Sequence, residues 1–157
     1  MTKPLLGALA ALALLAACSN SDENQQAATG SGGGASTIRP GSQEDLVANV
    51  GDRVFFTTDR SSIAADQRPV LQRQAEWMQR NSSVTVQVEG HADERGTREY
   101  NLALGQRRAN AARDTLVAGG VAGARISTIS YGKDRPAALG SDESAWAQNR
   151  RAVTVVR

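Results

Sequence analysis

The feature that most constrains the fold is an alternating segment followed by a glycine-bounded loop and a long helical pattern. Residues 84–88 alternate apolar and polar side chains, which predicts a strand with one buried face. Residues 90–96 begin and end with glycine and predict a loop. Residues 98–118 predict a helix, which Gly119 and Gly120 terminate. A strand followed by a long helix predicts a sheet with helices packed against it.

The rest of the chain supplies three more strands and a second long helix. Pro69 is tolerated only near the first turn of a helix, so that helix cannot start much before Ala64. The predicted strands are 52–56, 84–88, 125–131 and 151–156, the long helices 64–80 and 98–118, and the short helices 44–48 and 142–148. This order predicts an α+β fold, a two-layer βαβαβ-β sandwich with both long helices on one face of a mixed four-stranded sheet.

The helix over 98–118 has one face that must be buried. At about 100° per residue, the stripe of apolar and small side chains is Leu102, Gly105, Ala109, Ala112 and Leu116. Arg107 points almost opposite to this stripe and is expected in solvent. Arg108 lies about 70° from its centre, on the same flank as Asn101. We therefore expect Arg108 and Asn101, but not Arg107, at the rim where the helix meets the loop.

The loop over 90–96 places an acid, Asp93, at the end of a strand. Thr97 is a good N-cap for the helix, whose first N–H groups add positive potential. With Arg108, the site offers a cation, backbone donors and an anion, as a ligand carrying both a carboxylate and an ammonium requires. An internal Asp93–Arg108 salt bridge that only fixes the loop fits the same geometry equally well, so both interpretations stay open.

The N-terminus resembles the signal peptide of a bacterial lipoprotein. Lys3 precedes an apolar run over 4–17, which is too short to cross a bilayer as a helix and fits a secretory signal. Leu15-Ala16-Ala17-Cys18 resembles the lipobox, whose cysteine is acylated and becomes the first residue after cleavage. An ordinary cleavage site followed by a thiol is the alternative. Several acyl chains on Cys18 would anchor the protein stably, and Ser19 in place of aspartate favours the outer membrane.

Composition divides the chain after this signal peptide, residues 1–17. Residues 18–43 comprise the acylated cysteine and a linker rich in Asn, Gln, Ser, Thr and Gly, which is expected to be flexible. Residues 44–157 are long enough for one domain that needs no disulfide. Without Lys3, 17 of the 18 basic residues remain against 16 acidic ones, so charge gives no reason to expect nucleic acid as a partner.

The loop also holds residue types found in metal and acid–base sites. His91, Asp93 and Glu94 are close in sequence, but His91 is the only histidine in the chain. One histidine beside a carboxylate falls short of a three-ligand zinc site without remote acids. No serine or cysteine nucleophile pattern accompanies these residues. We therefore expect no enzymatic activity, no cofactor and no metal, and we interpret His91 as a loop-fixing or pocket-wall residue.

Several motifs together resemble the OmpA-like domain of the peptidoglycan-associated lipoproteins. They are Gly90–Thr97, Glu99–Asn101, Leu104–Asn110, Val54–Phe56 with Asp59, Ser130–Lys133 with Pro136, and Asn149–Val153. With the lipobox and the linker, the resemblance covers essentially the whole chain in the right order. It implies non-covalent binding of peptidoglycan through the diaminopimelate of the stem peptide.

The resemblance also implies which residues bind this ligand. Asp93 and Arg108 match the principal pair, and Asp59, Thr97 and Asn101 match secondary positions in the same pocket. The family usually has phenylalanine directly before the aspartate that Asp59 matches, whereas the present chain has threonine there. Asp59 is therefore the weaker assignment. The free end of diaminopimelate carries a carboxylate and an ammonium, whereas lysine at that stem position has no carboxylate. Lysine would leave Arg108 without its partner, at a cost of about 1–3 kcal/mol or more.

The resemblance further implies a role in the Tol-Pal system, with the periplasmic protein TolB as a partner on an overlapping surface. The expected function is a reversible, lipid-anchored tether between the outer membrane and the cell wall, supporting membrane integrity and constriction at division. The alternatives are an interaction module acting mainly through TolB and a cell-wall hydrolase. Arg150 and Arg151 are candidates for contact with either partner, although their default interpretation is solvated surface charge. Trp77 and Trp146 are interpreted as core or half-buried aromatics.

Overall fold

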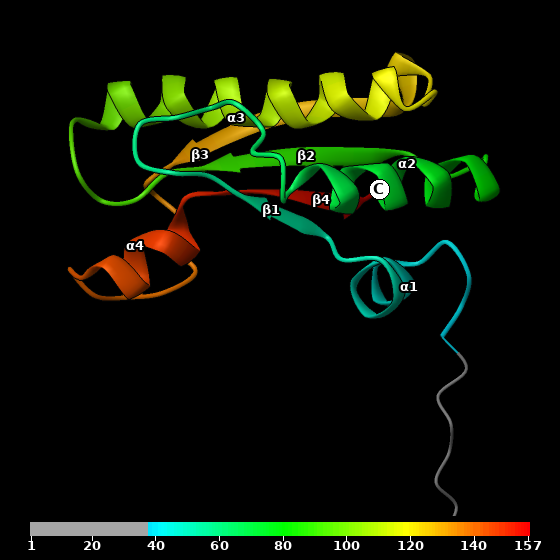
Figure 1. Cartoon of the computed structure of the whole chain (residues 1–157), viewed down its shortest axis with the longest axis horizontal. Helices are drawn as coiled ribbons and strands as arrows, with labels where there is room; N and C mark the ends of the chain where they lie inside the picture. Colours follow the sequence, from blue (N-terminus) through cyan, green and yellow to red (C-terminus); the bar gives the residue numbers. More distant parts are fainter. Residues whose placement is uncertain (1–37) are drawn as a thin grey trace, which may run out of the picture. The chain divides into compact units, whose positions relative to one another are not determined.

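A computed structural model describes residues 38–157, which form a mixed sheet with helices (Figure 1). In chain order the elements are α1 (Gln43–Asn49), β1 (Arg53–Phe55), α2 (Arg68–Arg80), β2 (Val86–His91), α3 (Arg98–Ala118), the 3-10 turn η1 (Gly123–Arg125), β3 (Ile126–Gly132), α4 (Glu143–Asn149) and β4 (Arg151–Val156). The predicted signal peptide, the acylation of Cys18 and most of the predicted linker fall outside the described residues.

The four strands form one sheet in the order β1-β4-β2-β3. β4 pairs antiparallel with both of its neighbours, Ala152 lying opposite Val54 and Thr154 opposite Val88. β2 and β3 run parallel, and α3 makes the crossover between them, as a parallel pair requires. The predicted α+β class with a mixed four-stranded sheet is confirmed.

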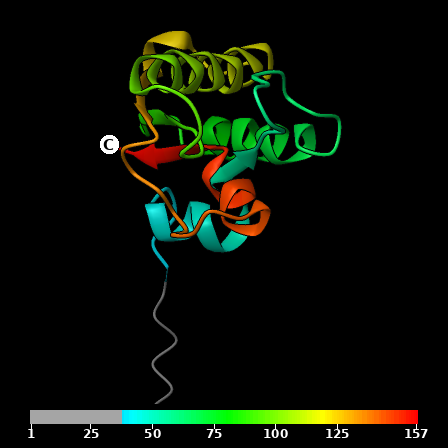
Figure 2. The ribbon, with the colours of Figure 1, turned by 90° about the vertical axis from the view of Figure 1, so that its left-hand side faces the viewer.

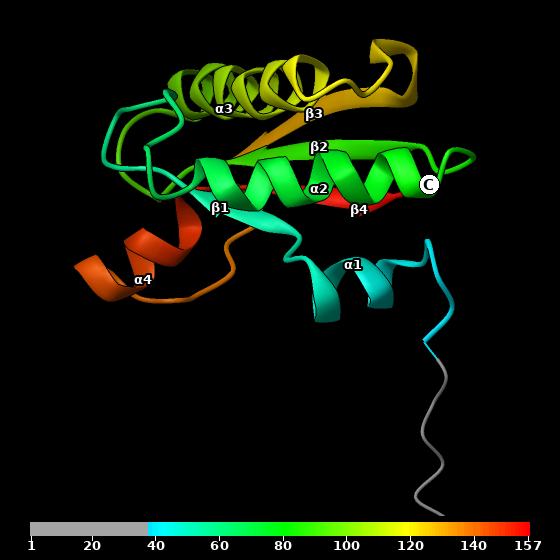
Figure 3. The same cartoon turned by 45° about the vertical axis from the view of Figure 1, so that its right-hand side comes forward.

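The core lies between one face of this sheet and the two long helices. α3 lies along β2 and β3, and α2 lies beside it toward β1 (Figure 3). Alternate strand residues, among them Val54, Val86, Val88 and Ala152, are buried in one apolar cluster with residues of both helices. At the β1 side of the molecule, away from α3, lie the short helices α1 and α4 (Figure 2).

The backbones of α3 and β2 touch where both have glycine. A methyl group on Gly90 would lie 1.8 Å from the carbonyl oxygen of Gly105, a distance that no side chain tolerates. Gly105 is buried, as its place in the predicted stripe requires. Leu102 is only partly buried, so its prediction as a core residue is wrong; Leu104 is buried instead. The buried face is shifted toward the flank of Asn101, Leu104 and Arg108, where the guanidinium of Arg108 is bonded to the segment between β1 and α2.

Several predicted boundaries shift for identifiable reasons. α2 begins at Arg68 rather than Ala64, because the preceding residues form a turn in which the N–H of Gln67 donates to Ala64. Pro69 thereby falls in the first turn, where it is tolerated. The strand predicted over 84–88 begins and ends later, as β2 (Val86–His91). Val84 lies before the strand, where it closes a turn by donating its N–H to the carbonyl of Asn81. The helix predicted over 98–118 and the strand predicted over 151–156 are confirmed.

Candidate ligand-binding site

Three segments that follow or begin regular elements surround a cavity at one end of the sheet. They are the segment after β1, the loop after β2 and the first turn of α3. The cavity has a volume of about 280 Å³ and is lined by Thr58, Asp59, Asp93, Arg95, Gly96 and Tyr100. Two of the predicted site residues, Asp93 and Asp59, therefore line one cavity although they come from different loops.

Asp93 is 7% exposed and accepts hydrogen bonds on both carboxylate oxygens. Its Oδ1 accepts from the backbone N–H and from Nε of Arg95, both at 3.1 Å. Its Oδ2 accepts from Nη2 of Arg95 at 2.7 Å and from Nη1 of Arg150 at 3.4 Å. Burial raises the pKa of Asp93, but the hydrogen bonds from Arg95 outweigh it, so the pKa of Asp93 lies below its ordinary value. Asp93 is an anion at neutral pH.

Asp59 and its neighbours Thr58 and Tyr100 form another part of the cavity lining. Asp59 has a φ of 56°, a left-handed conformation that aspartate adopts more readily than most side chains. Its Oδ1 accepts a hydrogen bond from the hydroxyl of Tyr100 at 3.3 Å. The wall therefore ends in a carboxylate that is only lightly engaged by its neighbours.

The two other residues predicted at secondary positions, Thr97 and Asn101, form hydrogen bonds within the first turn of α3 and to the loop after β2. Thr97 is the N-cap of α3, as predicted, and its hydroxyl accepts from the N–H of Tyr100. Asn101 is 2% exposed and donates to the carbonyl of Arg95 at 2.8 Å. Both residues adjoin the cavity, but neither is among the residues that line it.

Arg108 is fully buried, with 0% of its surface exposed. Its guanidinium donates to three backbone carbonyls, those of Arg60 at 2.8 Å, His91 at 2.8 Å and Thr57 at 3.1 Å. Burial lowers its pKa to about 10, against the opposing field of Asp93. Within the described residues, Asp93 pairs with Arg95 and Arg150, so the predicted alternative of an Asp93–Arg108 salt bridge is wrong.

Arg108 therefore lies behind the cavity rather than in its wall. The charged groups that act on it include Asp93 and Asp59, both of which line the cavity. It also ties the segment after β1 to the end of β2, because its carbonyl partners belong to these two segments. Arg107 is exposed, as predicted from the helix phase.

Five residues at this site were not among the predicted ligand-binding residues: Thr58, Arg95, Gly96, Tyr100 and Arg150. Arg95 stacks over the ring of Trp146, 4.0 Å from the centroid. The sequence signal that could have indicated Arg95 is its position only two residues after Asp93. The default interpretation of Arg150 as solvated charge is wrong, because Arg150 is 5% exposed and donates to the carbonyl of Phe56 and to Asp93.

Arg151 is also buried, so its default interpretation as solvated charge is wrong too. Its guanidinium donates to the carbonyls of Asn149 and Arg135. The two tryptophans agree with their prediction, since Trp77 belongs to the core and Trp146 is partly buried.

His91 is 2% exposed, and neither ring nitrogen has a hydrogen-bond partner. Its ring packs against that of Tyr131, with centroids 5.6 Å apart. Burial, helped by the charge of Arg151, lowers the pKa of His91 to about 4, so the ring is neutral at pH 7. Across residues 38–157, no cluster of three or more His, Cys, Asp or Glu side chains is arranged to hold a metal ion.

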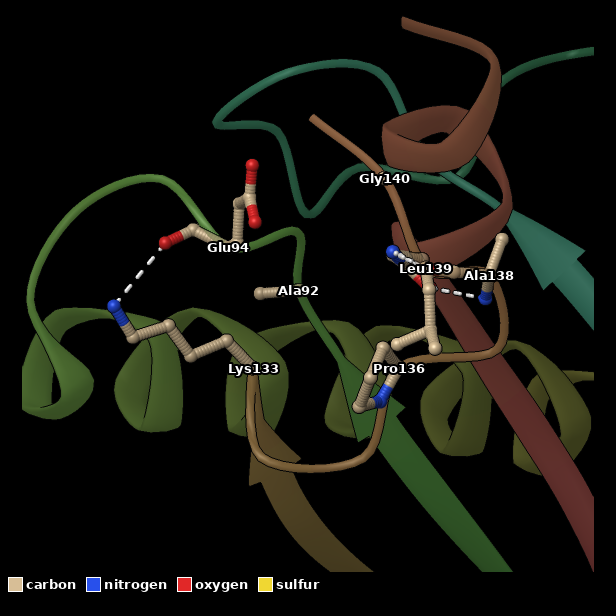
Figure 4. Close-up of a pocket in the computed structure, with 8 residues that line it drawn as sticks. Ala92, Glu94, Lys133, Pro136, Ala138, Leu139 and Gly140 are labelled. Atoms are coloured by element: carbon tan, nitrogen blue, oxygen red, sulfur yellow. Dashed lines mark hydrogen bonds between the residues drawn. The ribbon is translucent and has the colours of Figure 1, made fainter. Parts of the chain in front are cut away.

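A smaller pocket of about 190 Å³ lies beside the same loop (Figure 4). Its lining residues are Ala92, Glu94, Lys133, Pro136, Ala138, Leu139, Gly140 and Asn149. The ammonium of Lys133 donates to the carbonyls of Glu94 and Gly96, at 3.1 and 2.7 Å. Lys133 thus fixes the loop that carries Asp93.

Comparison with known proteins places this site in a family. A model of the OmpA family matches residues 55–150. A peptidoglycan-associated lipoprotein of Mesorhizobium japonicum is 54% identical over 153 residues, which cover 98% of this chain and 91% of that protein. The chain belongs to the OmpA family, among the peptidoglycan-associated lipoproteins. The expected family resemblance is confirmed.

Solved structures agree with this membership. The crystal structure of the peptidoglycan-associated lipoprotein from Burkholderia pseudomallei is 40% identical, with a TM-score of 0.68, and covers 72% of this chain and 100% of that chain. The C-terminal domain of Helicobacter pylori MotB, at 23% identity and a TM-score of 0.63, covers 68% of this chain and 84% of that chain, and shows the fold alone. Within residues 38–157, the helices are too short or too polar to cross a membrane.

Proposed function

We propose that this protein binds peptidoglycan non-covalently through the diaminopimelate of the stem peptide. The observation that carries the proposal is the cavity in which Asp59, Asp93 and Arg95 meet, with a buried guanidinium behind it. The names of the relatives associate those proteins with peptidoglycan. This is a binding function, and the chain, like its relatives, is not an enzyme.

The chemistry of the ligand matches the charges of the cavity. The free end of diaminopimelate carries a carboxylate and an ammonium on one carbon, so it needs both an anionic and a cationic partner at close range. Asp93 and Asp59 both line the cavity and supply the negative charge. The positive charge comes from arginine, whose planar guanidinium matches a carboxylate better than an ammonium does.

We propose that Asp93 and Arg108 are the principal binding pair, in unequal roles. Asp93 lines the cavity and its charge faces the ligand. Arg108 carries a buried positive charge that is hydrogen-bonded to neutral carbonyls. A buried cation of this kind is costly until an anion approaches it, so a bound carboxylate would offset part of that cost. Thr97 and Asn101 hold the loop in shape.

The anchor belongs to the same proposal. Acylation of Cys18 after removal of residues 1–17 would attach the chain to the outer membrane, with residues 18–43 as a tether and residues 44–157 in the periplasm. A non-covalent grip on the wall suits such a tether, because the link forms and breaks without chemistry. By family membership we extend the proposal to the Tol-Pal system, to TolB as a protein partner, and to outer-membrane integrity and invagination during division.

Pull-down of the full chain with isolated sacculi tests the proposal. We expect Asp93→Ala and Arg108→Ala to reduce binding strongly and Arg107→Ala, one residue away on the exposed face of α3, to leave it unchanged. Diaminopimelate added in excess should compete with the sacculi. If Arg108→Ala still binds sacculi and Arg107→Ala does not, the proposed site is refuted. If diaminopimelate does not compete with the sacculi, the proposed ligand is refuted.

A further inference from the structure

The two edges of the sheet are protected to different degrees. The strand order β1-β4-β2-β3 makes β1 and β3 the outer strands. β1 has only three residues, one of which is Arg53, and the N–H of Phe55 already donates to Oε1 of Gln67 at 3.0 Å. A short strand, a charged side chain and a covered edge are the usual means by which a protein prevents an edge from pairing with another chain. β1 is therefore a protected edge.

The edge at β3 lacks these protections. β3 has seven residues, Ile126–Gly132, and contains neither a charged residue nor a proline. Its main neighbours among the described elements are β2, α3 and the turn η1. Within residues 38–157, no strand pairs with its outer edge. β3 therefore presents a row of backbone donors and acceptors that match those of a further strand.

β3 is held in place by contacts on the side away from this edge. Its residues pair in parallel with β2, Thr128 lying opposite Val88 and Ile129 opposite Glu89. The hydroxyl of Thr128 also accepts a hydrogen bond from Nε2 of Gln106 in α3, at 3.0 Å. A strand that is already fixed loses little conformational entropy when a partner strand pairs with it, which reduces the cost of binding.

The sequence of β3 is complementary to itself. In an antiparallel pair centred on Ile129, this residue lies opposite its own copy. Thr128 then lies opposite Ser130 on one face, where the two hydroxyls are able to form a hydrogen bond. On the other face Ser127 lies opposite Tyr131, and no like charges meet because β3 has no charged residue. A two-fold axis requires a self-complementary surface, and β3 meets this requirement.

We propose that β3 pairs antiparallel with β3 of a second copy of this chain, so that the two sheets join into one with Ile129 at the two-fold axis. The pairing does not depend on the proposed function. No residue that lines the ligand cavity belongs to β3, so the dimer carries two cavities. With the proposed function, two linked sites bind one polymer more tightly than a single site does.

Sedimentation of the full chain carrying Cys18→Ser, which removes the proposed site of acylation, tests the pairing. We expect a dimer at high protein concentration and a monomer on dilution. Ile129→Lys places two like charges opposite each other at the axis and should weaken the dimer about tenfold or more. Phe55→Lys is the matched control: it adds the same charge to the other edge strand, where Phe55 is 39% exposed, and should leave the dimer unchanged.

Crosslinking through a single cysteine locates the contact. Cys18 is the only cysteine of the chain, so a cysteine introduced together with Cys18→Ser is unique. Ile129→Cys should form a covalent dimer with a short thiol crosslinker, because opposite positions of paired strands lie about 4.5–5.5 Å apart. Phe55→Cys should remain a monomer at the same protein concentration. Thermal unfolding of each variant checks that the fold is intact.

Each outcome supports or overturns the pairing. A dimer that Ile129→Lys weakens and Phe55→Lys does not, with crosslinking of Ile129→Cys alone, supports it. A chain that is monomeric at every concentration overturns it, and so does a dimer that Ile129→Lys leaves intact, because that dimer uses another surface. If Ile129→Lys does not fold, the crosslinking decides: equal crosslinking of Ile129→Cys and Phe55→Cys, or none, overturns the pairing.

Discussion

Two arginines clamp backbone carbonyls at opposite ends of β2, and only one of them lies beside a cavity with acidic walls. Arg108 donates to the carbonyls of Thr57, Arg60 and His91. Arg125 donates to the carbonyls of Met78, Asn81 and Val84, at 2.7–2.9 Å. Both arginines thus tie a loop to a strand end by satisfying carbonyls that the regular elements leave over.

The surroundings of the two clamps differ. Arg108 is fully buried, and the charges of Asp93 and Asp59 act on it across the cavity. Arg125 is partly exposed, and within residues 38–157 its hydrogen-bond partners are all backbone carbonyls. The difference teaches that such a clamp serves the structure by itself, and that only the clamp at Arg108 is accompanied by acids and a cavity in which the proposed ligand could bind.

The largest expected effect on the free energy of unfolding comes from adding a methyl group to a glycine close in sequence to one of the two clamps. Gly90→Ala would place a methyl group 1.8 Å from the Gly105 carbonyl and force α3 away from β2. We expect a loss of about 4 kcal/mol or more in the free energy of unfolding. Gly123→Ala, in the turn that carries Arg125, meets nothing closer than 3.4 Å and should cost less than about 1 kcal/mol. Urea unfolding measures both; equal losses would contradict the close approach.

Removing the clamps themselves separates stability from binding. Arg108→Met leaves three carbonyls without their donor and should cost about 3 kcal/mol. Arg125→Met should cost about 1–2 kcal/mol, because its carbonyls lie nearer to solvent. Sacculus binding should be lost in the first variant and retained in the second at a temperature where both are folded. Equal binding by the two variants would show that the acidic surroundings of Arg108 carry no function.

A fall in pH should destabilise the end of β2 beside the cavity before it destabilises the end beside Arg125. The pKa of buried His91 is about 4, below its ordinary 6.5, so the unfolded chain takes up a proton in this range before the folded one does. The contribution of neutral His91 is therefore complete above about pH 6.5 and is lost as pH falls toward 4, at most about 3 kcal/mol. The charged groups that act on it or contact it are Arg53, Glu89, Arg135 and Arg151.

Stability measured against pH checks this contribution. His91→Leu should remove most of the slope between pH 6.5 and 4, and hydrogen exchange in that range should rise near His91 before it rises near Arg125. The same slope in the variant and in the unmodified protein would assign the acid sensitivity to other groups.

The smallest expected effect on stability is at Asp59. Asp59→Asn keeps a side chain that tolerates its φ of 56°, so the free energy of unfolding should change by less than about 0.5 kcal/mol. Loss of the negative charge should nevertheless weaken binding of a stem pentapeptide that contains diaminopimelate. Unchanged affinity would leave Asp93 as the partner of the ammonium and remove Asp59 from the site.

The fold could be predicted because its signals are local. Alternation gave the strands and helical periodicity separated exposed Arg107 from Arg108 on the opposite flank. Boundaries were less certain where a turn competes with an element, as it does before Arg68. Leu102 was misplaced because a segment far away in sequence covers the flank of Arg108 and shifts the buried face toward it, and periodicity within one helix contains no information about that segment.

The sequence predicted several residues of the site but not the hydrogen bonds that these residues make. The family motif brought Asp93 and Asp59 to one cavity. The carbonyl clamp of Arg108 reaches residues 48 and 51 positions away, and Arg150 reaches Asp93 across 57 positions. Such long-range hydrogen bonds depend on tertiary packing, so the sequence could not indicate that Arg108 is covered while Arg95 faces the cavity.

The most direct test of the cavity as the binding site is a titration of the ¹⁵N-labelled protein with the diaminopimelate pentapeptide, followed by NMR. Amide shifts should concentrate at Asp59, Arg95, Gly96 and Tyr100 around the cavity, with Val84 and Arg125 at the other clamp unchanged. Shifts concentrated around Arg125, or no shifts at a concentration where the protein binds sacculi, would contradict the site.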